Sequence, residues 1–318
     1  MLQTDQRALG ASSLVVPALG VGTWSWGDAR FWGYGQSHTQ DDVTQAYHIC
    51  LDAGLNFFDT AEGYGGGESE RLLGQCRRAD GRASIIATKF APLPWRASSS
   101  ALLRALDGSL ERLGVERIDL YQIHLPPPRL NPIMDALAEA VQSGKVRAVG
   151  VSNFSASLMR RAHARLAHHG IPLASNQVQY SLLHRNPEKN GLLDACRELD
   201  VTLIAASPLA QGVLSGKFRV GTISRSLTRR IMGGMALGIG ATRREKLEPL
   251  FLILEEIARA HDKTIAQVAL NWLITRDSCI IPIPGAKNVR QASENAGALG
   301  WRLTEAEHAH ISQAAPLS

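Results

Sequence analysis

Short apolar runs alternate with longer stretches of helical periodicity along most of the 318-residue chain. Each run is bounded by polar or glycine residues, which is typical of a short buried strand. The predicted strands are, in chain order, residues 18–23, 56–58, 84–88, 120–123, 148–151, 174–178, 202–206 and 279–282.

Between the predicted strands, apolar side chains recur at the three- and four-residue spacing of one helix face, as in Val43, Ala46, Tyr47 and Cys50. Eight such strand–helix units favour a closed barrel over an open sheet. Right-handed crossovers make all the strands parallel and bring their carboxyl ends to one face. We predict a single α/β domain over residues 1–318, a (β/α)8 TIM barrel with an N-terminal β-hairpin.

Residues 218–242 break this rhythm, because they show no clean period and are rich in glycine. They follow the seventh predicted strand, so we expect them at the carboxyl-end face of the barrel. A loop of this length is commonly functional or disordered. We interpret it as a loop that covers a ligand, with a mobile insertion as the alternative. Helical spacing resumes near Arg243, and Thr304 to Glu307 has a capping-box pattern.

Ionisable side chains follow three successive predicted strands. Asp59 is the first residue after the second apolar run, and Tyr64 lies five residues later in a glycine-rich loop. Lys89 ends the third strand and His124 ends the fourth. Each residue alone has an ordinary structural explanation, such as a cap, a packed ring or a solvated charge. Together, at successive strand ends, they predict one catalytic group.

Several ordered motifs carry a family resemblance. They are Asp59-Thr-Ala-x-x-Tyr64-Gly, Thr88-Lys89, the strand ending in His124, Gly150-Val-Ser-Asn-Phe154, Gly20-Val-Gly-Thr-Trp24, Ile283-Pro-Gly-Ala-Lys-Asn288 and Gly297-Ala-Leu-Gly-Trp301. Together they resemble the aldo-keto reductase superfamily. Its chloroplast and cyanobacterial branch is the one most resembled by Trp24-Ser-Trp-Gly27, Phe31-Trp-Gly-Tyr34 and Pro284-Gly-Ala-Lys287. The resemblance implies a barrel whose bottom is closed by the hairpin.

Carbonyl reduction, which the resemblance implies, needs a hydride donor and a proton donor at the oxygen. Tyr64 is the candidate general acid, and a free phenol has a pKa of about 10. A charged Lys89 beside it would lower that pKa, and Asp59 would hold Lys89 by a buried ion pair. His124 would donate a second hydrogen bond and orient the substrate. These are the four catalytic residues that the resemblance implies.

A nicotinamide cofactor is expected, but no Gly-x-Gly-x-x-Gly motif follows a strand, so a Rossmann domain is not predicted. Barrels bind phosphates at late loops and helix starts instead. The resemblance assigns the carboxamide, pyrophosphate and adenosine ends of the cofactor to successive late loops. The expected cofactor-binding residues are Thr23, Trp24, Asp59, Ser152, Asn153, Gln177, Ser207, Pro208, Leu209, Gln211, Gly212, Leu214, Ser215, Lys217, Gly285, Lys287, Gln291 and Asn295.

Two positions depart from the family pattern. Ala206 stands where members often carry an aromatic residue that stacks on nicotinamide, and Gln291 stands where many carry an arginine. Lys287, with Arg290 as a second cation nearby in the sequence, is then the residue that would pair with a ribose 2′-phosphate. The expected cofactor is therefore NADPH, with NADH less favoured; the alternative for Lys287 is a solvated turn lysine.

Tryptophans gather in the loops after the first and third predicted strands, which suggests an aromatic pocket for a small carbonyl substrate. The expected substrate-binding residues are Trp24, Trp26, Tyr64, Trp95 and His124. The natural substrate is left open by these residues.

Composition and net charge bear on the class of partner and on where the protein works. A net charge of +5 without a clustered basic stripe argues against nucleic acid, and no run approaches the roughly 18 apolar residues of a membrane span. The four cysteines are scattered, and no His, Cys and carboxylate set has metal-ligand spacing, so we expect no metal. Without a signal-peptide core we expect a cytoplasmic protein, monomeric or weakly oligomeric.

Two other functions fit the sequence less well. A barrel of this family could keep its cofactor as a redox sensor or accessory subunit with little turnover, as potassium-channel β subunits do. A lyase or aldolase could use Lys89 as a Schiff base, but Asp59 and Tyr64 would then lack clear roles.

Overall fold

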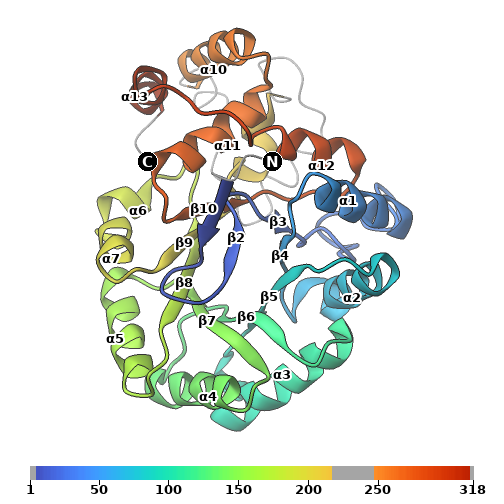
Figure 1. Cartoon of the computed structure of the whole chain (residues 1–318), viewed down its shortest axis with the longest axis vertical. Coiled ribbons are helices and arrows are strands. Elements are labelled where there is room, and N and C mark those ends of the chain that lie inside the picture. Colours follow the sequence, from blue (N-terminus) through green and yellow to red (C-terminus); the bar gives the residue numbers. More distant parts are fainter. Residues whose placement is uncertain (1–4, 217–246, 316–318) are drawn as a thin grey trace.

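The structure, a computed structural model, describes residues 5–216 and 247–315. Within this part, eight parallel strands form one sheet in which each strand pairs with its neighbours in the chain (Figure 1). These strands are β3 (Val21–Gly22), β4 (Phe57–Asp59), β5 (Ile85–Phe90), β6 (Ile118–Ile123), β7 (Val146–Ser152), β8 (Leu173–Gln179), β9 (Thr202–Ala206) and β10 (Ile280–Ile283). The predicted α/β class and the alternation of strands and helices are confirmed.

The sheet closes between its first and last strands. Gly22 forms a parallel bridge with Gly285, and the N–H groups of Gly20 and Gly22 donate to the carbonyls of Pro282 and Pro284 at 2.9 and 3.0 Å. Strand β3 is shorter than the predicted 18–23, because residues 18 and 19 bend before the ladder begins. This short contact between the first strand and the last, which we call the seam of the barrel, still completes the (β/α)8 barrel.

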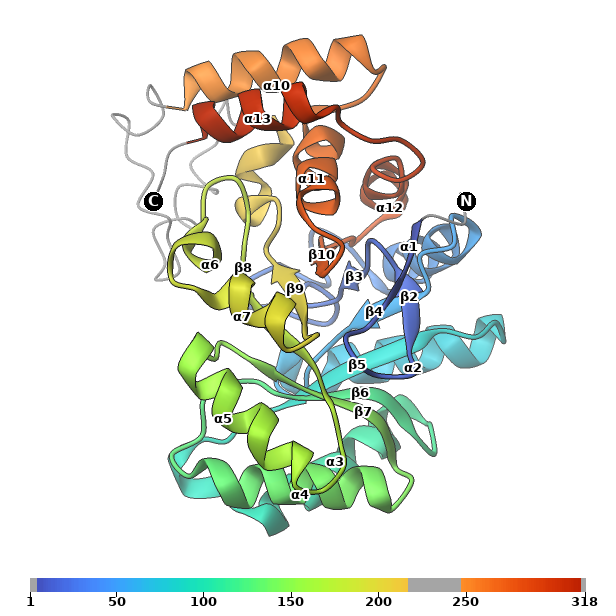
Figure 2. The ribbon, with the colours of Figure 1, turned by 60° about the vertical axis from the view of Figure 1, so that its left-hand side comes forward.

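Helices follow the strands and cover the outside of the barrel (Figure 1). Their bounds are α1 (Gln40–Asp52), α2 (Glu68–Asp80), α3 (Ser99–Leu113), α4 (Leu130–Gln142), α5 (Ala156–Ala167), α6 (Asn186–Lys189), α7 (Leu192–Glu198), α10 (Glu248–Ala260), α11 (Ile265–Arg276), α12 (Val289–Ala296) and α13 (Glu305–Ala314). Figure 2 shows α10 and α13 side by side beyond this ring. The capping box at Thr304 and Glu307 is confirmed, while the helix start expected near Arg243 lies outside the described residues.

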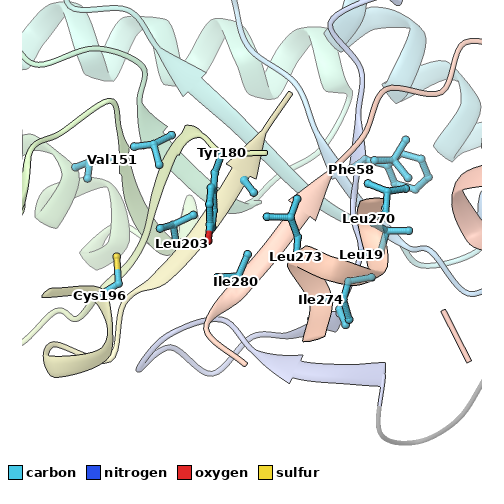
Figure 3. Packing of buried hydrophobic residues seen from close by; sticks show 14 of the residues in the cluster. Leu19, Phe58, Val151, Tyr180, Cys196, Leu203, Leu270, Leu273, Ile274 and Ile280 are labelled. Carbon is cyan, nitrogen blue, oxygen red and sulfur yellow. The ribbon is translucent and has the colours of Figure 1, made fainter. Parts of the chain in front are cut away.

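Two apolar layers hold the fold. The outer layer packs strand side chains such as Phe58, Val151 and Leu203 against helix side chains such as Leu273 (Figure 3). The inner layer fills the barrel and includes Val16 of the hairpin strand β2 (Val15–Pro17), together with Leu9 and Leu14 of the turn that joins β2 to β1 (Gln6–Ala8). Its buried members are Leu9, Leu14, Val16, Phe57, Ala87, Leu120, Ala148, Ala174, Ile204, Ile281 and Ile283. The hairpin therefore closes the amino-end mouth of the barrel, as expected.

The barrel interior turns from apolar to polar toward the carboxyl ends of the strands. Side chains two residues apart in a strand share a face, so Asp59 follows Phe57 and Lys89 follows Ala87 on the inner side. The pairing of β7 with β8 shifts between Val149 and Gly150. Such a one-residue shift reverses which face a side chain occupies, and it turns Gln177 inward.

Candidate active site

The fully buried ammonium of Lys89 is the centre of the site. Its Nζ donates to Asp59 Oδ1 at 2.5 Å, to the Thr60 carbonyl at 2.7 Å and to the Tyr64 hydroxyl at 3.5 Å. An ammonium has three N–H groups, so all of them are used. Side chains from β4, from the turn after it and from β5 thus meet at one point, as the strand-end pattern predicts.

The second carboxylate oxygen of Asp59 is held by two amides. Oδ2 accepts hydrogen bonds from Gln122 Nε2 at 3.0 Å and from Gln177 Nε2 at 2.9 Å. Gln177 was expected here as a cofactor ligand, whereas Gln122 was not expected at all. Its signal in the sequence is its position two residues after Leu120, on the inward face of β6.

Charge coupling sets the protonation of this group. Burial alone would lower the pKa of Lys89, but the Asp59 charge and Tyr64 outweigh it and raise that pKa, so the ammonium stays charged. Burial raises the pKa of Tyr64, with Asp59 adding to the effect and Lys89 opposing it. The expectation that Lys89 lowers the Tyr64 pKa is right in sign for that one interaction and wrong for the net result, because burial dominates.

Tyr64 begins a 3-10 turn, η2 (Tyr64–Gly67), that leads directly into α2. Gly65 in this turn has φ of 57°, and a Cβ on it would lie 2.6 Å from the Gly27 carbonyl oxygen. Only glycine therefore fits there. The turn is anchored by Ser69, whose Oγ lies 2.8 Å from the Thr23 hydroxyl and 2.9 Å from the Thr60 hydroxyl.

His124 lies beside Tyr64, with the ring centroids 5.7 Å apart and the planes near perpendicular. Burial, and then the charge of Lys89, lower the pKa of His124 to about 3. The imidazole is therefore neutral near pH 7, with one N–H to donate. Its main chain is fixed at both sides: the N–H donates to the Phe90 carbonyl at 2.8 Å, and its carbonyl accepts from Asn153 Nδ2 at 3.0 Å.

A cavity of about 290 Å³ opens beside Asp59 and Tyr64 and extends toward the loop after β10. Fourteen of the residues expected to bind the cofactor line it. They are Thr23, Trp24, Asp59, Gln177, Ser207, Pro208, Leu209, Gln211, Gly212, Ser215, Gly285, Lys287, Gln291 and Asn295. The predicted late loops therefore do converge on one elongated site.

Three expected cofactor residues lie outside the cavity lining. Ser152 and Asn153 lie next to the cavity but not in its lining, and they bond to the Gln177 carbonyl and the His124 carbonyl. Leu214 is fully buried in the outer core, so its side chain cannot reach a ligand. Lys217 and the 218–242 loop lie outside the described residues.

The cavity wall after β9 has an unusual backbone. Ser207, Ala210 and Gln211 have φ of 50°, 49° and 55°, a region that costs non-glycine residues energy. Such strain gathers at binding and catalytic sites, where the surrounding structure holds it. Ala206, the position without an aromatic ring, also lines the cavity.

Of the three tryptophans expected to bind substrate, Trp24 lines the cavity and the other two do not. Trp24 lines the cavity and stacks on Tyr64, with centroids 6.0 Å apart, and Trp32 lines it as well. Trp26, expected to bind substrate, is fully buried and donates its indole N–H to the Ala286 carbonyl, so it is a core residue. Trp95, also expected there, is 80% exposed on the 3-10 turn η3 (Pro94–Arg96) and outside the cavity lining.

The far end of the cavity carries mixed charge. Lys287 Nζ donates to the Ser37 hydroxyl at 3.0 Å, and the Gln291 side chain accepts from the Lys287 N–H at 3.1 Å. Arg290 lies 3.8 Å from Glu294, a cavity-lining carboxylate, so its charge is partly matched within α12. Lys287 is thus the cation among the described residues that line this end.

Within residues 5–216 and 247–315, no helix is long and apolar enough to cross a membrane. Nor, among the same residues, do three or more His, Cys, Asp or Glu gather in a way that could hold a metal ion.

Comparisons with known proteins agree with this geometry. The model of the "Aldo/keto reductase family" matches residues 18–316. The chloroplastic pyridoxal reductase of Arabidopsis thaliana is 40% identical over 95% of this chain and 84% of its own. A Klebsiella pneumoniae aldo-keto reductase solved in complex with NADPH is 29% identical, with a TM-score of 0.76 over 98% of this chain and 95% of its own. A glycerol dehydrogenase of Gluconobacter oxydans is 26% identical, with a TM-score of 0.84 over 98% and 95%.

Proposed function

The chain belongs to the aldo/keto reductase family, and we propose that it reduces aldehydes or ketones to alcohols with NADPH, Tyr64 acting as the general acid. One observation carries the proposal: the Tyr64 hydroxyl borders the cavity and accepts from a buried, charged Lys89. Asp59, Lys89 and His124 are the other catalytic residues in this proposal.

Tyr64 gives its proton to the carbonyl oxygen as negative charge develops there. Because the pKa of Tyr64 is raised in the folded chain, the phenol holds this proton near neutral pH. The Lys89 ammonium stabilises the phenolate that remains, and Asp59 keeps the ammonium charged and in place. The neutral His124 donates a hydrogen bond to the same oxygen and sets the orientation of the substrate.

The cavity residues fit a nicotinamide dinucleotide. Gln177 and Ala206 line the end beside Asp59, the strained Ser207–Gly212 segment lines the middle, and Lys287 and Asn295 line the far end. When bound, NADPH supplies the hydride that no side chain can supply. Lys287 would pair with the 2′-phosphate, and the NADPH complex of the Klebsiella relative supports this choice over NADH.

An aromatic aldehyde is the first substrate class to test. Trp24 and Trp32 give the cavity two flat apolar surfaces beside Tyr64, which suit a ring. The Arabidopsis relative is a pyridoxal reductase, so pyridoxal is the leading candidate.

Schiff-base chemistry at Lys89 fits poorly. Its side chain is fully buried, its three N–H groups are used, and its pKa is raised. A lysine nucleophile must be neutral and accessible, and this one is neither.

The test is NADPH oxidation, followed by absorbance, with pyridoxal and a panel of aromatic and aliphatic aldehydes. Wild type should turn over, and Tyr64→Phe should lose about 10²-fold or more of kcat while binding NADPH with unchanged affinity. Equal turnover by both proteins would remove Tyr64 as the acid. Tight NADPH binding without turnover on any carbonyl would favour the redox-sensor function instead.

A further inference from the structure

We propose that Gln122 is a positioning residue for the reaction, acting through Asp59; this inference rests on the proposed function. Gln122 is fully buried on the inner face of β6, and its Nε2 donates to Asp59 Oδ2 at 3.0 Å. It does not line the cavity, so it touches neither substrate nor cofactor. Its effect reaches the reaction through the carboxylate that holds Lys89.

The chemistry of the group fixes the orientation of the Gln122 amide. A carboxylate only accepts hydrogen bonds, so the NH₂ end must face Asp59 and the carbonyl oxygen must face away. Lys89 cannot bond to that oxygen, because its three N–H groups are already used. Among the described residues the buried Gln122 Oε1 has no hydrogen-bond partner.

This unpartnered oxygen makes Gln122 costly for stability. Leaving a buried acceptor unpaired is unfavourable, and an apolar side chain of the same shape avoids that penalty. The neighbourhood is tightly packed: a Cβ on Gly150 would lie 3.1 Å from Gln122 Cγ and 2.3 Å from the hydroxyl of Ser175. The Ser175 hydroxyl is likewise unpartnered. Stability alone would not favour glutamine at position 122. Its presence is explained by the hydrogen bond that its amide donates to Asp59.

The second amide on Asp59 cannot replace the first. Gln177 lines the cavity, where the proposed function needs it for the cofactor, whereas Gln122 is shielded from the cavity. Gln122 is therefore the donor that keeps Asp59 in place whether or not the site is loaded. Loss of this donor leaves the Asp59–Lys89 pair less well oriented toward Tyr64.

The experiment compares two variants of matched shape in the full chain. Gln122→Met removes the donor and the unpartnered oxygen together, and it should lower kcat about tenfold or more, because the lost hydrogen bond is made to a charged group. KM for the carbonyl and the Tm should change little, because the lost donor and the lost unpaired acceptor offset each other. Wild-type kcat in this variant would overturn the proposal.

Gln122→Glu tests the pH dependence of activity, which would not change if Gln122 had only a structural role. At low pH the introduced carboxyl is protonated and donates to Asp59 as the amide does, because two adjacent carboxylates cannot both ionise easily. Activity should be near wild type there and fall as pH rises, at pH values where wild type is unaffected. A wild-type pH profile in this variant would overturn the proposal.

A second measurement, of Tm, needs no turnover. It therefore tests the contact between position 122 and Asp59 even where the protein reduces no carbonyl. In the unliganded protein the introduced carboxyl has a raised folded-state pKa. Its contribution to stability is therefore lost as pH rises above the unfolded value of about 4.3. Adding Asp59→Asn should remove most of this loss of Tm, because the repelling charge is gone. The same loss with and without Asp59→Asn would show that position 122 does not act through Asp59.

Discussion

Replacing Lys89 by methionine tests whether the buried ion pair supports both the fold and the chemistry. Methionine keeps most of the length and apolar stem but removes the charge. In the structure the change would leave Asp59, 2% exposed, with its two amide donors and no cation. Removing one partner of a buried pair costs about 3–5 kcal/mol, because the other charge is left uncompensated.

The magnitude converts into a measurable shift. With an unfolding entropy of about 2.1 cal/mol/K per residue, this loss lowers Tm by roughly 4.5–7.5 °C for a chain of this length. Turnover should fall by about 10³-fold, because Tyr64 then loses the Lys89 charge, which opposes the effect of burial on its pKa. Calorimetry near pH 7 and NADPH oxidation measure the two effects on the same sample.

The double variant Asp59→Asn with Lys89→Met is the matched control. It removes both charges, so most of the lost stability should return while activity stays absent. A Tm for Lys89→Met equal to that of the double variant would refute the reasoning, since Asp59 would then not depend on Lys89 for its charge. Turnover within tenfold of wild type would refute the catalytic part alone.

Three further predictions follow from other contacts. The pKa of His124 is lowered from 6.5 to about 3, so the unfolded chain takes up this proton first and stability is lost as pH falls through that window; His124→Gln should flatten the unfolding free energy there, and an unchanged slope would contradict the assignment. Lys287→Ala should raise the KM for NADPH about tenfold and leave that for NADH unchanged, and an equal rise for both would exclude a role at the 2′-phosphate. Trp24→Ala should lower kcat/KM for pyridoxal more than for an aliphatic aldehyde, with a difference in activation free energy of about 0.5–1.5 kcal/mol. Equal losses for the two substrates would show that the pyridoxal ring does not lie against Trp24.

The alternation of short apolar runs with stretches of helical spacing is enough to predict the barrel. Buried parallel strands and amphipathic helices place their apolar residues at different intervals along the sequence. The same reasoning placed Asp59 and Lys89, since a polar residue directly after an apolar run must face the end of the barrel. Gln122 was not predicted because it lies inside an apolar run, where a single polar residue does not indicate a site. Only its position two residues after Leu120, which faces the barrel interior, shows that Gln122 faces inward too. The bulge that turns Gln177 inward leaves no signal in composition at all.

The errors concern side chains whose direction depends on distant contacts. Trp26 and Trp24 are two residues apart in one loop, yet only the former meets the Ala286 carbonyl and becomes part of the core. Trp95 stays exposed because η3 turns it away from the cavity lining. The net pKa of Tyr64 needed the depth of burial, which a motif does not contain.

The seam of the barrel has a consequence for how the protein is held together. Gly22 and Gly285 come from opposite ends of the chain, and both line the cavity. Contacts between such distant residues are entropically expensive and tend to form late in folding. A ligand that touches both sides of the seam binds the folded chain and not the unfolded one, so it fastens the first strand to the last. Under the proposed function the dinucleotide is such a ligand, so we expect its removal to lower Tm and to make the contact between the first and last strands easier to open.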